Sequence, residues 1–338
     1  MCGIVGFFSP RHQGNSKPLI EGLELLKHRG PNDSGFWLRD NVGLGSTRLS
    51  IQDLSSKGKM PMNSQCGRYV ITYNGEIYNF KKIRKSLINK GLCFKTKTDT
   101  EVILNLYKIK GEKCLDQLNG MFSIAIYDKE KKSLFIARDR YGIKPLYYYK
   151  SNDFFLFASE IKAFIPFVKF HKLSWEIEQN AISEQLLFRY NSGDITLVKN
   201  CKRLLPGHRI ILKNNNIINF NHYYKLIENR KKSYNRSFKE SINLLERKLK
   251  KSVKYRLISD APVGIALSGG LDSSIVTALA SQRLKNNPKT FSITFNKNKL
   301  DESKYSDFIA KKYETSHHKI LLTKKNFFKL LPKCVWFN

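Results

Sequence analysis

A cysteine at position 2, directly after the initiator methionine, is well placed to act as a nucleophile. If Met1 is removed, the Cys2 thiol and a free α-amino group share one Cα atom. An α-amino group has a pKa of about 7.7–8.0, so a neutral fraction can accept a proton near pH 7. A thiol beside such a base is an activated nucleophile. A cysteine at this position can also be inert, so its partner residues must decide its role.

A second candidate site is the segment Ser268-Gly269-Gly270-Leu271-Asp272-Ser273-Ser274, which follows an apolar run and opens a helical pattern. Its glycines permit a tight turn whose amides converge on an anion, and the helix N-terminus adds partial positive charge. The Gly-Lys-Ser/Thr ending of a Walker A loop is missing. Since the Asp272 carboxylate would repel a phosphate, we expect it to hold Mg²⁺ or to cap the helix. An ordinary strand-to-helix turn is the alternative, but a position at the end of a parallel strand favours nucleotide binding.

The elements that must position these residues divide the chain into two parts. The first part is rich in short β-like runs, with two predicted helices at 79–90 and 100–110. The β-like runs are residues 3–8, 68–73, 122–127, 134–138 and 154–158. Many strands with few helices indicate an α+β domain.

The second part follows a polar stretch at 214–237, which we interpret as a linker. Helices are predicted at about 236–258, 273–284, 302–313 and 324–331, and strands at 263–267, 290–295 and 318–322. This β-α-β-α-β order is typical of a parallel sheet with crossover helices. We therefore predict domains at 1–213 and 238–338, joined by the linker.

Composition excludes several classes of protein. The length of 338 residues fits two domains. The sequence contains no apolar run of about 18 residues, so we predict no membrane span, and its first residues lack the basic segment of a signal peptide. The six cysteines lack Cys-x-x-Cys spacing, which argues against zinc or disulfides and fits a reducing cytoplasm. The net charge of +32 is spread along the chain, so we favour compositional drift over nucleic-acid binding.

In chain order, the motifs make this sequence similar to glutamine-hydrolysing asparagine synthetases. The matching segments are Met1-Cys2-Gly3-Ile4, His28-Arg29-Gly30-Pro31, Arg48-Leu49-Ser50-Ile51, Asn74-Gly75-Glu76-Ile77-Tyr78-Asn79, Asp99, Gly120-Met121-Phe122, Arg138-Asp139, Gly142-Ile143-Lys144-Pro145-Leu146-Tyr147, Ala158-Ser159-Glu160, Leu205-Pro206-Gly207-His208, the loop from Ser268, and Asp301-Glu302-Ser303. The loop resembles that of the ATP pyrophosphatase (PP-loop) family. The resemblance implies a glutaminase domain of the N-terminal-nucleophile type with layered antiparallel sheets, followed by part of a parallel-sheet PP-loop domain. It also implies glutamine, ATP, Mg²⁺ and an acceptor, aspartate or another carboxylate, and is compatible with a homodimer.

The resemblance further implies roles for individual residues. Cys2 would attack the glutamine amide while its own α-amino group shuttles the proton, and Asn74 and Gly75 would donate to the oxyanion. Arg48 would grip the substrate α-carboxylate, and Asp99 would accept from its ammonium. The other implied contacts are Leu49, Ile51 and Glu76 for glutamine, and Leu267, Ser268, Gly269, Gly270, Asp272, Ser273, Ser274 and Ile293 for ATP, with Asp272 also at Mg²⁺.

Several of these residues also fit purely structural roles. Asn74-Gly75 would suit a turn after the strand at 68–73, and Asp99 could cap the helix that follows. We interpret Arg29 and Arg138-Asp139 as members of structural ion pairs. Glu160 and Lys162 receive no chemical role.

Members of this family continue for a long C-terminal stretch that this sequence does not include. We interpret the chain as truncated and expect glutaminase activity without asparagine synthesis. A half-built parallel sheet should expose apolar surface. Three alternatives remain open: an amidotransferase for another carboxylate such as a polysaccharide sugar acid, a tRNA-modifying PP-loop protein, and an inactive remnant.

Overall fold

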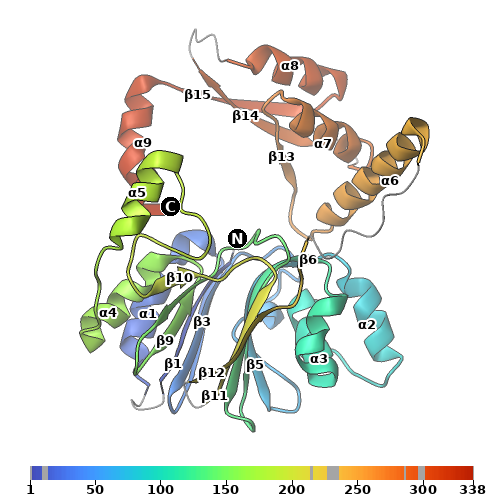
Figure 1. The fold of residues 1–338 in the computed structure, drawn as a ribbon. Helices are drawn as coiled ribbons and strands as arrows, with labels where there is room; N and C mark the ends of the chain where they lie inside the picture. Colours follow the sequence, from blue (N-terminus) through green and yellow to red (C-terminus); the bar gives the residue numbers. More distant parts are fainter. Residues whose placement is uncertain are drawn as a thin grey trace. The chain divides into compact units, whose positions relative to one another are not determined.

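The computed structural model describes residues 2–9, 14–213, 216–226, 236–284, 287–295 and 301–337. They form two compact units, residues 1–231 and 232–338, and each unit is considered by itself (Figure 1). Met1 and residues 227–235 of the predicted linker lie outside the described residues. Within the described ranges, no helix combines the length and the apolarity needed to cross a membrane.

The first unit contains two six-stranded antiparallel sheets. In the first sheet the order is β10-β8-β9-β1-β3-β2, and in the second it is β12-β11-β7-β6-β5-β4. The first sheet consists of β1 (Gly3–Phe8), β2 (Asp33–Arg39), β3 (Val42–Arg48), β8 (Tyr147–Lys150), β9 (Phe155–Ala158) and β10 (Cys201–Arg203). The second consists of β4 (Met62–Asn63), β5 (Tyr69–Ile77), β6 (Gly120–Asp128), β7 (Ser133–Arg138), β11 (His208–Lys213) and β12 (Asn216–His222).

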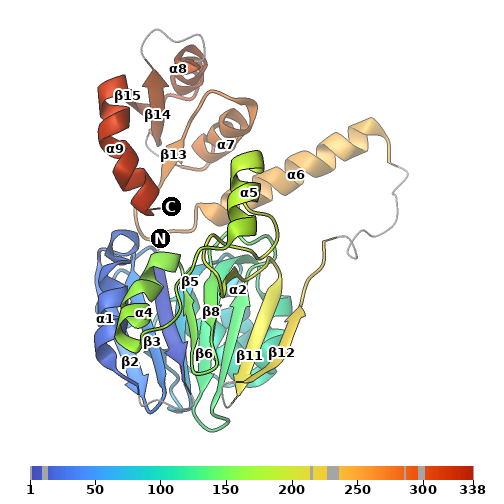
Figure 2. The same cartoon turned by 60° about the vertical axis from the view of Figure 1, so that its left-hand side comes forward.

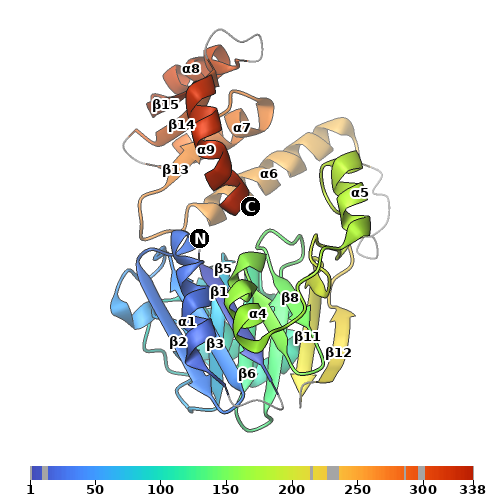
Figure 3. The ribbon, with the colours of Figure 1, turned by 90° about the vertical axis from the view of Figure 1, so that its left-hand side faces the viewer.

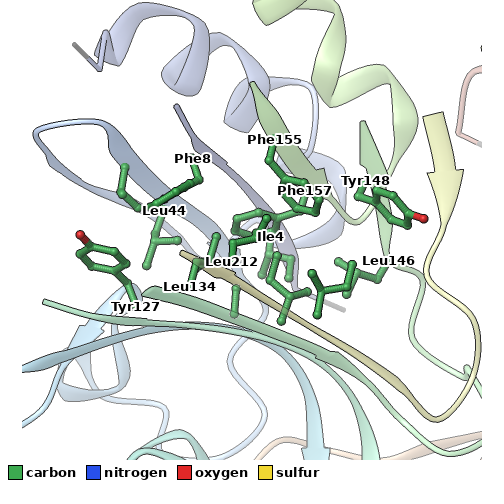
Figure 4. Close-up of a cluster of buried hydrophobic side chains, with 14 of the residues drawn as sticks. Ile4, Phe8, Leu44, Tyr127, Leu134, Leu146, Tyr148, Phe155, Phe157 and Leu212 are labelled. Atoms are coloured by element: carbon green, nitrogen blue, oxygen red, sulfur yellow. The ribbon is translucent and has the colours of Figure 1, made fainter. Parts of the chain in front are cut away.

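The two sheets pack face to face on a buried apolar cluster (Figure 4). Ile4 and Phe8 of β1 point into this cluster and meet Leu134 from the second sheet. Successive side chains of a strand point to opposite faces, so Val5 and Phe7 of the same strand pack on the other side. Strand β1 is therefore buried on both faces, and Cys2 directly precedes it.

Helices cover the outer faces of both sheets. Helices α1 (Ser16–Glu24) and α4 (Ile165–His171) pack on the first sheet (Figure 3), and α3 (Asp99–Lys110) packs on β5 beside α2 (Phe80–Ile88). Helix α5 (Gln179–Phe188) follows in the chain. The resulting layers, helix, sheet, sheet and helix, confirm the predicted α+β class.

Two expectations for the first unit were wrong. Besides the two predicted helices, the described part of this unit also contains α1, α4 and α5. Helix α1 forms because Leu19 and Leu23 are buried against the first sheet and the Asn15 side chain caps the helix by accepting from Lys17 N. The linker predicted from residue 214 starts too early, since residues 216–222 form strand β12. Its mostly polar sequence hides the strand, in which Ile217 packs against the core.

The second unit begins with α6 (Phe238–Arg256), which carries a Ser237/Glu240 capping box. There follow β13 (Gly264–Ala266), α7 (Leu271–Ser281), β14 (Lys289–Phe295), α8 (Ser303–Lys312), β15 (Ser316–Leu322) and α9 (Lys324–Phe337) (Figure 2). The strands pair in parallel in the order β13-β14-β15, which confirms the predicted β-α-β-α-β unit. Helix α9 continues past its predicted end at 331, through Pro332.

One face of this parallel sheet is apolar and exposed. Phe291, Ile293 and Ile320 are 43%, 63% and 62% exposed, whereas Thr290 and Ser292, which point the opposite way, are buried. Ile293 pairs with Ile320 in the register, so their side chains share this face. The expected exposure of apolar surface on a small parallel sheet is confirmed.

Candidate active site

Cys2 lies at the beginning of β1, opposite the end of the neighbouring strand β3. Gly3 pairs with Thr47, and the Leu49 N–H points at the Cys2 Sγ at 3.4 Å. Arg29 Nε donates to the Cys2 carbonyl at 3.1 Å. Burial raises the pKa of the Cys2 thiol, and the contact with Leu49 opposes this. The structure therefore holds Cys2 through both its side chain and its backbone.

One pocket collects every residue that the resemblance assigned to glutamine. These residues are Cys2, Arg48, Leu49, Ile51, Asn74, Gly75, Glu76 and Asp99. They come from the residue before β1, from β3, the loop after β3, β5 and the first turn of α3. The pocket thus draws on both sheets and on a helix, although the residues assigned to glutamine are spread over almost 100 positions of the chain.

Asn74 and Gly75 lie inside strand β5, and the expectation of a turn at this point is wrong. The Asn74 side chain is fully buried, and within the described residues neither its Nδ2 nor its Oδ1 has a hydrogen-bond partner. Buried amides are almost always paired in folded proteins. An unpaired amide that lines a pocket with a thiol is therefore poised to bind a ligand.

The backbone of Gly75 is also open toward a ligand. Gly75 pairs with Phe122 of β6, but Phe122 N donates to Asp139 Oδ2 and Phe122 O accepts from Asp139 N. Since both backbone groups of Phe122 are engaged by Asp139, the Gly75 N–H is directed away from β6. A Cβ on residue 75 would lie 2.2 Å from Met121 O, so only glycine allows this close approach.

Two buried carboxyl groups face the same pocket. Asp99 accepts from Tyr73 OH at 2.8 Å and from Ile77 N at 2.9 Å, and burial raises its pKa to about 6. Glu76 accepts from Gln52 Nε2 at 2.5 Å, and burial together with the charge of Asp99 raises its pKa to about 8. Thr98, rather than Asp99, caps α3 by accepting from Glu101 N.

These raised pKa values predict how the affinity for glutamine depends on pH. Binding of an α-ammonium group stabilises the ionised carboxylates, so it expels the protons that Asp99 and Glu76 hold in the free protein. As the pH is lowered, affinity should therefore fall about tenfold per pH unit between the two pKa values. Below the lower pKa, where both protons must be expelled, it should fall about a hundredfold per unit. Calorimetry of glutamine binding to the Cys2→Ala variant in buffers of different ionisation enthalpy would measure both affinity and proton release. Asp99→Asn should bind weakly and release fewer protons; unchanged release would contradict this assignment.

Arg48 uses its guanidinium differently from the sequence expectation. Its Nη1 donates to Ser55 O at 2.9 Å, and its Nη2 donates to Asp53 O at 2.5 Å and Gln52 O at 3.3 Å. A Cβ on Gly58 would lie 2.1 Å from the Arg48 Nη2, so this glycine makes room for the side chain. Arg48 thereby shapes the loop that carries Gln52, and its grip on a substrate carboxylate stays a prediction.

The prediction that Arg29 and Arg138-Asp139 form structural ion pairs is confirmed for Arg29 only. Arg29 Nη1 pairs with Glu160 Oε1 at 2.6 Å, and Glu160 also contacts His28 and Lys162. Arg138 and Asp139 do not pair with each other in the described part of the chain. Arg138 donates to the carbonyls of Gly142, Lys144 and Leu204, and Asp139 accepts from four backbone amides, those of Phe122, Tyr141, Ile143 and Lys144.

Lys144 is a pocket residue that sequence reasoning missed. Its side chain is only 4% exposed and lines the pocket beside Cys2 and Glu76. The segment that carries it matched the family, but a lysine within it gave no sign of burial.

The loop of the second unit has the shape of an anion site. Gly269 adopts φ +94°, where a Cβ would come within 2.8 Å of Ser306 N, and Gly270 is the N-cap of α7. Ser268 and Ser273 hydroxyls lie 3.0 Å apart, and the Ser274 hydroxyl donates to Gly270 O at 2.7 Å. The helix start therefore presents backbone amides and hydroxyls together.

The remaining residues predicted to contact ATP, Leu267, Ile293 and Asp272, lie in different parts of the second unit. Leu267 is buried, and its N–H donates to Phe291 O at 2.8 Å, which makes it a structural part of the loop. Ile293 lies two residues further along β14 on the exposed apolar face. Asp272 stands in the first turn of α7, and among the described residues no group of three or more His, Cys, Asp or Glu side chains could hold a metal.

Comparison with known proteins agrees with this fold and site. Residues 1–224 match the family described as Glutamine amidotransferase domain, and residues 244–338 match the family described as Asparagine synthase. A solved glutamine phosphoribosylpyrophosphate amidotransferase from B. subtilis shares the fold, with a TM-score of 0.50 and 15% identity over 95% of this chain and 81% of that one. The fold and the pocket thus define a glutamine amidotransferase domain of the N-terminal-nucleophile class.

Curated relatives narrow the family. A putative glutamine-hydrolysing asparagine synthetase from Methanocaldococcus jannaschii is 32% identical over 99% of this chain and 68% of its own length. Asparagine synthetase 1 of Bacillus subtilis is 33% identical over 99% of this chain, which spans 52% of that protein. A Gibberella zeae protein named amidase chry2 is 34% identical over 86% of this chain and 44% of its own length. The chain belongs to the asparagine synthetase family of glutamine-dependent amidotransferases. It spans 44% to 68% of the length of these relatives named asparagine synthetase.

Proposed function

We propose that this chain hydrolyses glutamine to glutamate and ammonia at Cys2, and that its second unit binds ATP to activate a carboxylate acceptor, aspartate in the first place. The observation that carries the proposal is the pocket in which a thiol, an unpaired buried amide and two carboxyl groups meet. These are the nucleophile, the oxyanion donor and the ammonium ligands that glutamine hydrolysis requires.

In the proposed reaction, the Cys2 sulfur attacks the side-chain amide carbon of glutamine. The α-amino group of Cys2 takes the thiol proton and passes it to the departing nitrogen, so the C–N bond breaks as ammonia leaves. Water then cleaves the thioester and releases glutamate. Asn74 Nδ2 and the Gly75 N–H hold the oxygen that becomes negative in both steps.

Substrate selection is proposed to rest on Asp99 and Glu76. Both would hold the α-ammonium group of glutamine, while Tyr73 and Gln52 keep the two carboxyl groups in place. A glutamine residue within a polypeptide has the same side-chain amide but no α-ammonium group. The pocket therefore favours the free amino acid over a protein side chain.

In the second unit, the loop after β13 is proposed to hold the phosphates of ATP through the amides at the start of α7 and the hydroxyls of Ser268, Ser273 and Ser274. Asp272 is acidic and lies in the first turn, so it could serve a Mg²⁺ ion that ATP brings with it. The runner-up acceptor is another carboxylate. Its support is that a relative named amidase is as similar to this chain as those named asparagine synthetase.

Product analysis of the purified chain tests the proposal. We expect glutamate and ammonia in equal amounts from glutamine without ATP. Release of AMP and pyrophosphate that aspartate stimulates would support aspartate as the acceptor, and stimulation by a sugar acid would favour the runner-up. A chain with Cys2 at its N-terminus, shown by intact mass, that forms no glutamate would overturn the glutaminase proposal.

A further inference from the structure

We propose that Lys144 is an electrostatic positioning residue, whose ammonium group allows a thiolate to form at Cys2 in a pocket built with carboxylates. The inference rests on the proposed glutaminase function and deepens it, because it explains how one pocket serves both a cationic substrate group and an anionic nucleophile.

The backbone of Lys144 is fixed on both sides. Its N–H donates to Asp139 Oδ2 at 3.0 Å, and its carbonyl accepts from Arg138 Nε at 2.7 Å. Asp139 is fully buried and Arg138 nearly so. The next carbonyl, that of Pro145, accepts from Ser123 Oγ at 3.0 Å. The loop therefore delivers Lys144 to the pocket in one position.

The amine at the end of this side chain has no carboxylate of its own. None of the ion pairs between described residues includes the Lys144 Nζ, and the side chain is 4% exposed. A buried ammonium without a counter-ion is costly, and such groups gather at functional sites. Burial lowers the pKa of the Lys144 amine, and nearby Glu76 opposes that shift.

The other charged groups around Cys2 explain why a free positive charge is needed. Glu76 on β5 and Asp99 on α3 both disfavour a thiolate. Arg29 is paired with Glu160, and Arg48 donates to carbonyls of the loop at 52–55. Apart from the N-terminal amine, whose charge also lowers the pKa of the Cys2 thiol, Lys144 is the positive group of the pocket that is tied neither to a carboxylate nor to a loop carbonyl in the described chain. A positive charge within about 4–6 Å favours an anion by one to three pKa units.

The rate at which iodoacetamide alkylates Cys2, followed from pH 6 to 10 by mass spectrometry of the Cys2 peptide, tests the inference. In Lys144→Met, we expect the midpoint of this profile to move up by about one pH unit or more, and the rate at neutral pH to fall about tenfold. Lys144→Arg should keep the wild-type midpoint. Lys129→Met removes a lysine of the same unit that contacts Asn63 and not the pocket, so it should change nothing.

Alkylation separates this inference from the proposed function, because it needs no turnover. The exposed Cys66 thiol, measured in the same digest, reports on reactivity in general. A folded Lys144→Met protein with the wild-type Cys2 midpoint would overturn the role of Lys144, even if glutamine is hydrolysed. A shifted midpoint in a chain without glutaminase activity would support Lys144 and remove the proposed reaction instead. If Lys144→Met does not fold, Lys144→Gln supplies a second neutral variant with the same two readings.

Discussion

Replacing Cys2 with alanine should abolish glutamine hydrolysis while glutamine still binds. The covalent step depends on the thiol, and loss of a nucleophile in enzymes with covalent intermediates lowers kcat by roughly 10⁴-fold or more. The contacts proposed for the substrate come from Asn74, Glu76 and Asp99, which this change leaves intact. Glutamate formation and equilibrium glutamine binding, measured on the same preparation, should therefore separate completely.

Cys66→Ala is the matched control for this substitution. Cys66 is exposed, and the Ser64 hydroxyl beside it lowers the pKa of its thiol, so it is the more reactive cysteine by ordinary chemical criteria. It lies outside the pocket and should be dispensable for hydrolysis. If Cys2→Ala kept its turnover, or Cys66→Ala lost it, the nucleophile would be wrongly assigned.

Asn74→Ala should lower kcat by about 10²–10³-fold with a much smaller change in KM. One amide donor to an oxyanion contributes this much, because its hydrogen bond strengthens only as negative charge develops. The substitution should leave thermal stability unchanged or raise it, since it removes a buried amide that has no partner in the described structure. Steady-state kinetics and thermal unfolding of the free protein would measure the two effects.

Asn105→Ala provides the comparison. Asn105 is also buried, its Nδ2 is likewise unpartnered among the described residues, and it lies on α3 outside the pocket. It should change stability in a similar way and leave kcat alone. Equal losses of kcat in both variants, or a loss of folding in Asn74→Ala, would indicate a structural role for Asn74.

Residue type and local pattern were enough to predict much of this protein. Cys2 could be named from its position beside an α-amino group, whereas Asn74 and Asp99 were assigned through the resemblance to asparagine synthetases. The loop from Ser268 could be placed because alternation of strands and helices around two glycines is a local signal. The hairpin of β2 and β3 was not predicted, because its glycines weaken the β pattern of the sequence. Packing nevertheless requires glycine at position 43, since a Cβ there would lie 2.3 Å from the Phe7 ring.

The sequence by itself determined the class of the two units and, through its resemblance to a known family, the residues expected to contact glutamine. Only the tertiary structure decided how these residues are used. It places Asn74-Gly75 within a strand, directs the Arg48 guanidinium to carbonyls of the loop at 52–55, and carries Lys144 to the pocket beside Cys2. The physical reason is that hydrogen bonds and charges act through space. Asp139 binds the Phe122 backbone and so leaves the Gly75 amide free, although it lies more than 60 positions after Gly75 in the chain. The same carboxylate fixes the backbone of Lys144, five positions further on. Chain spacing reveals neither contact.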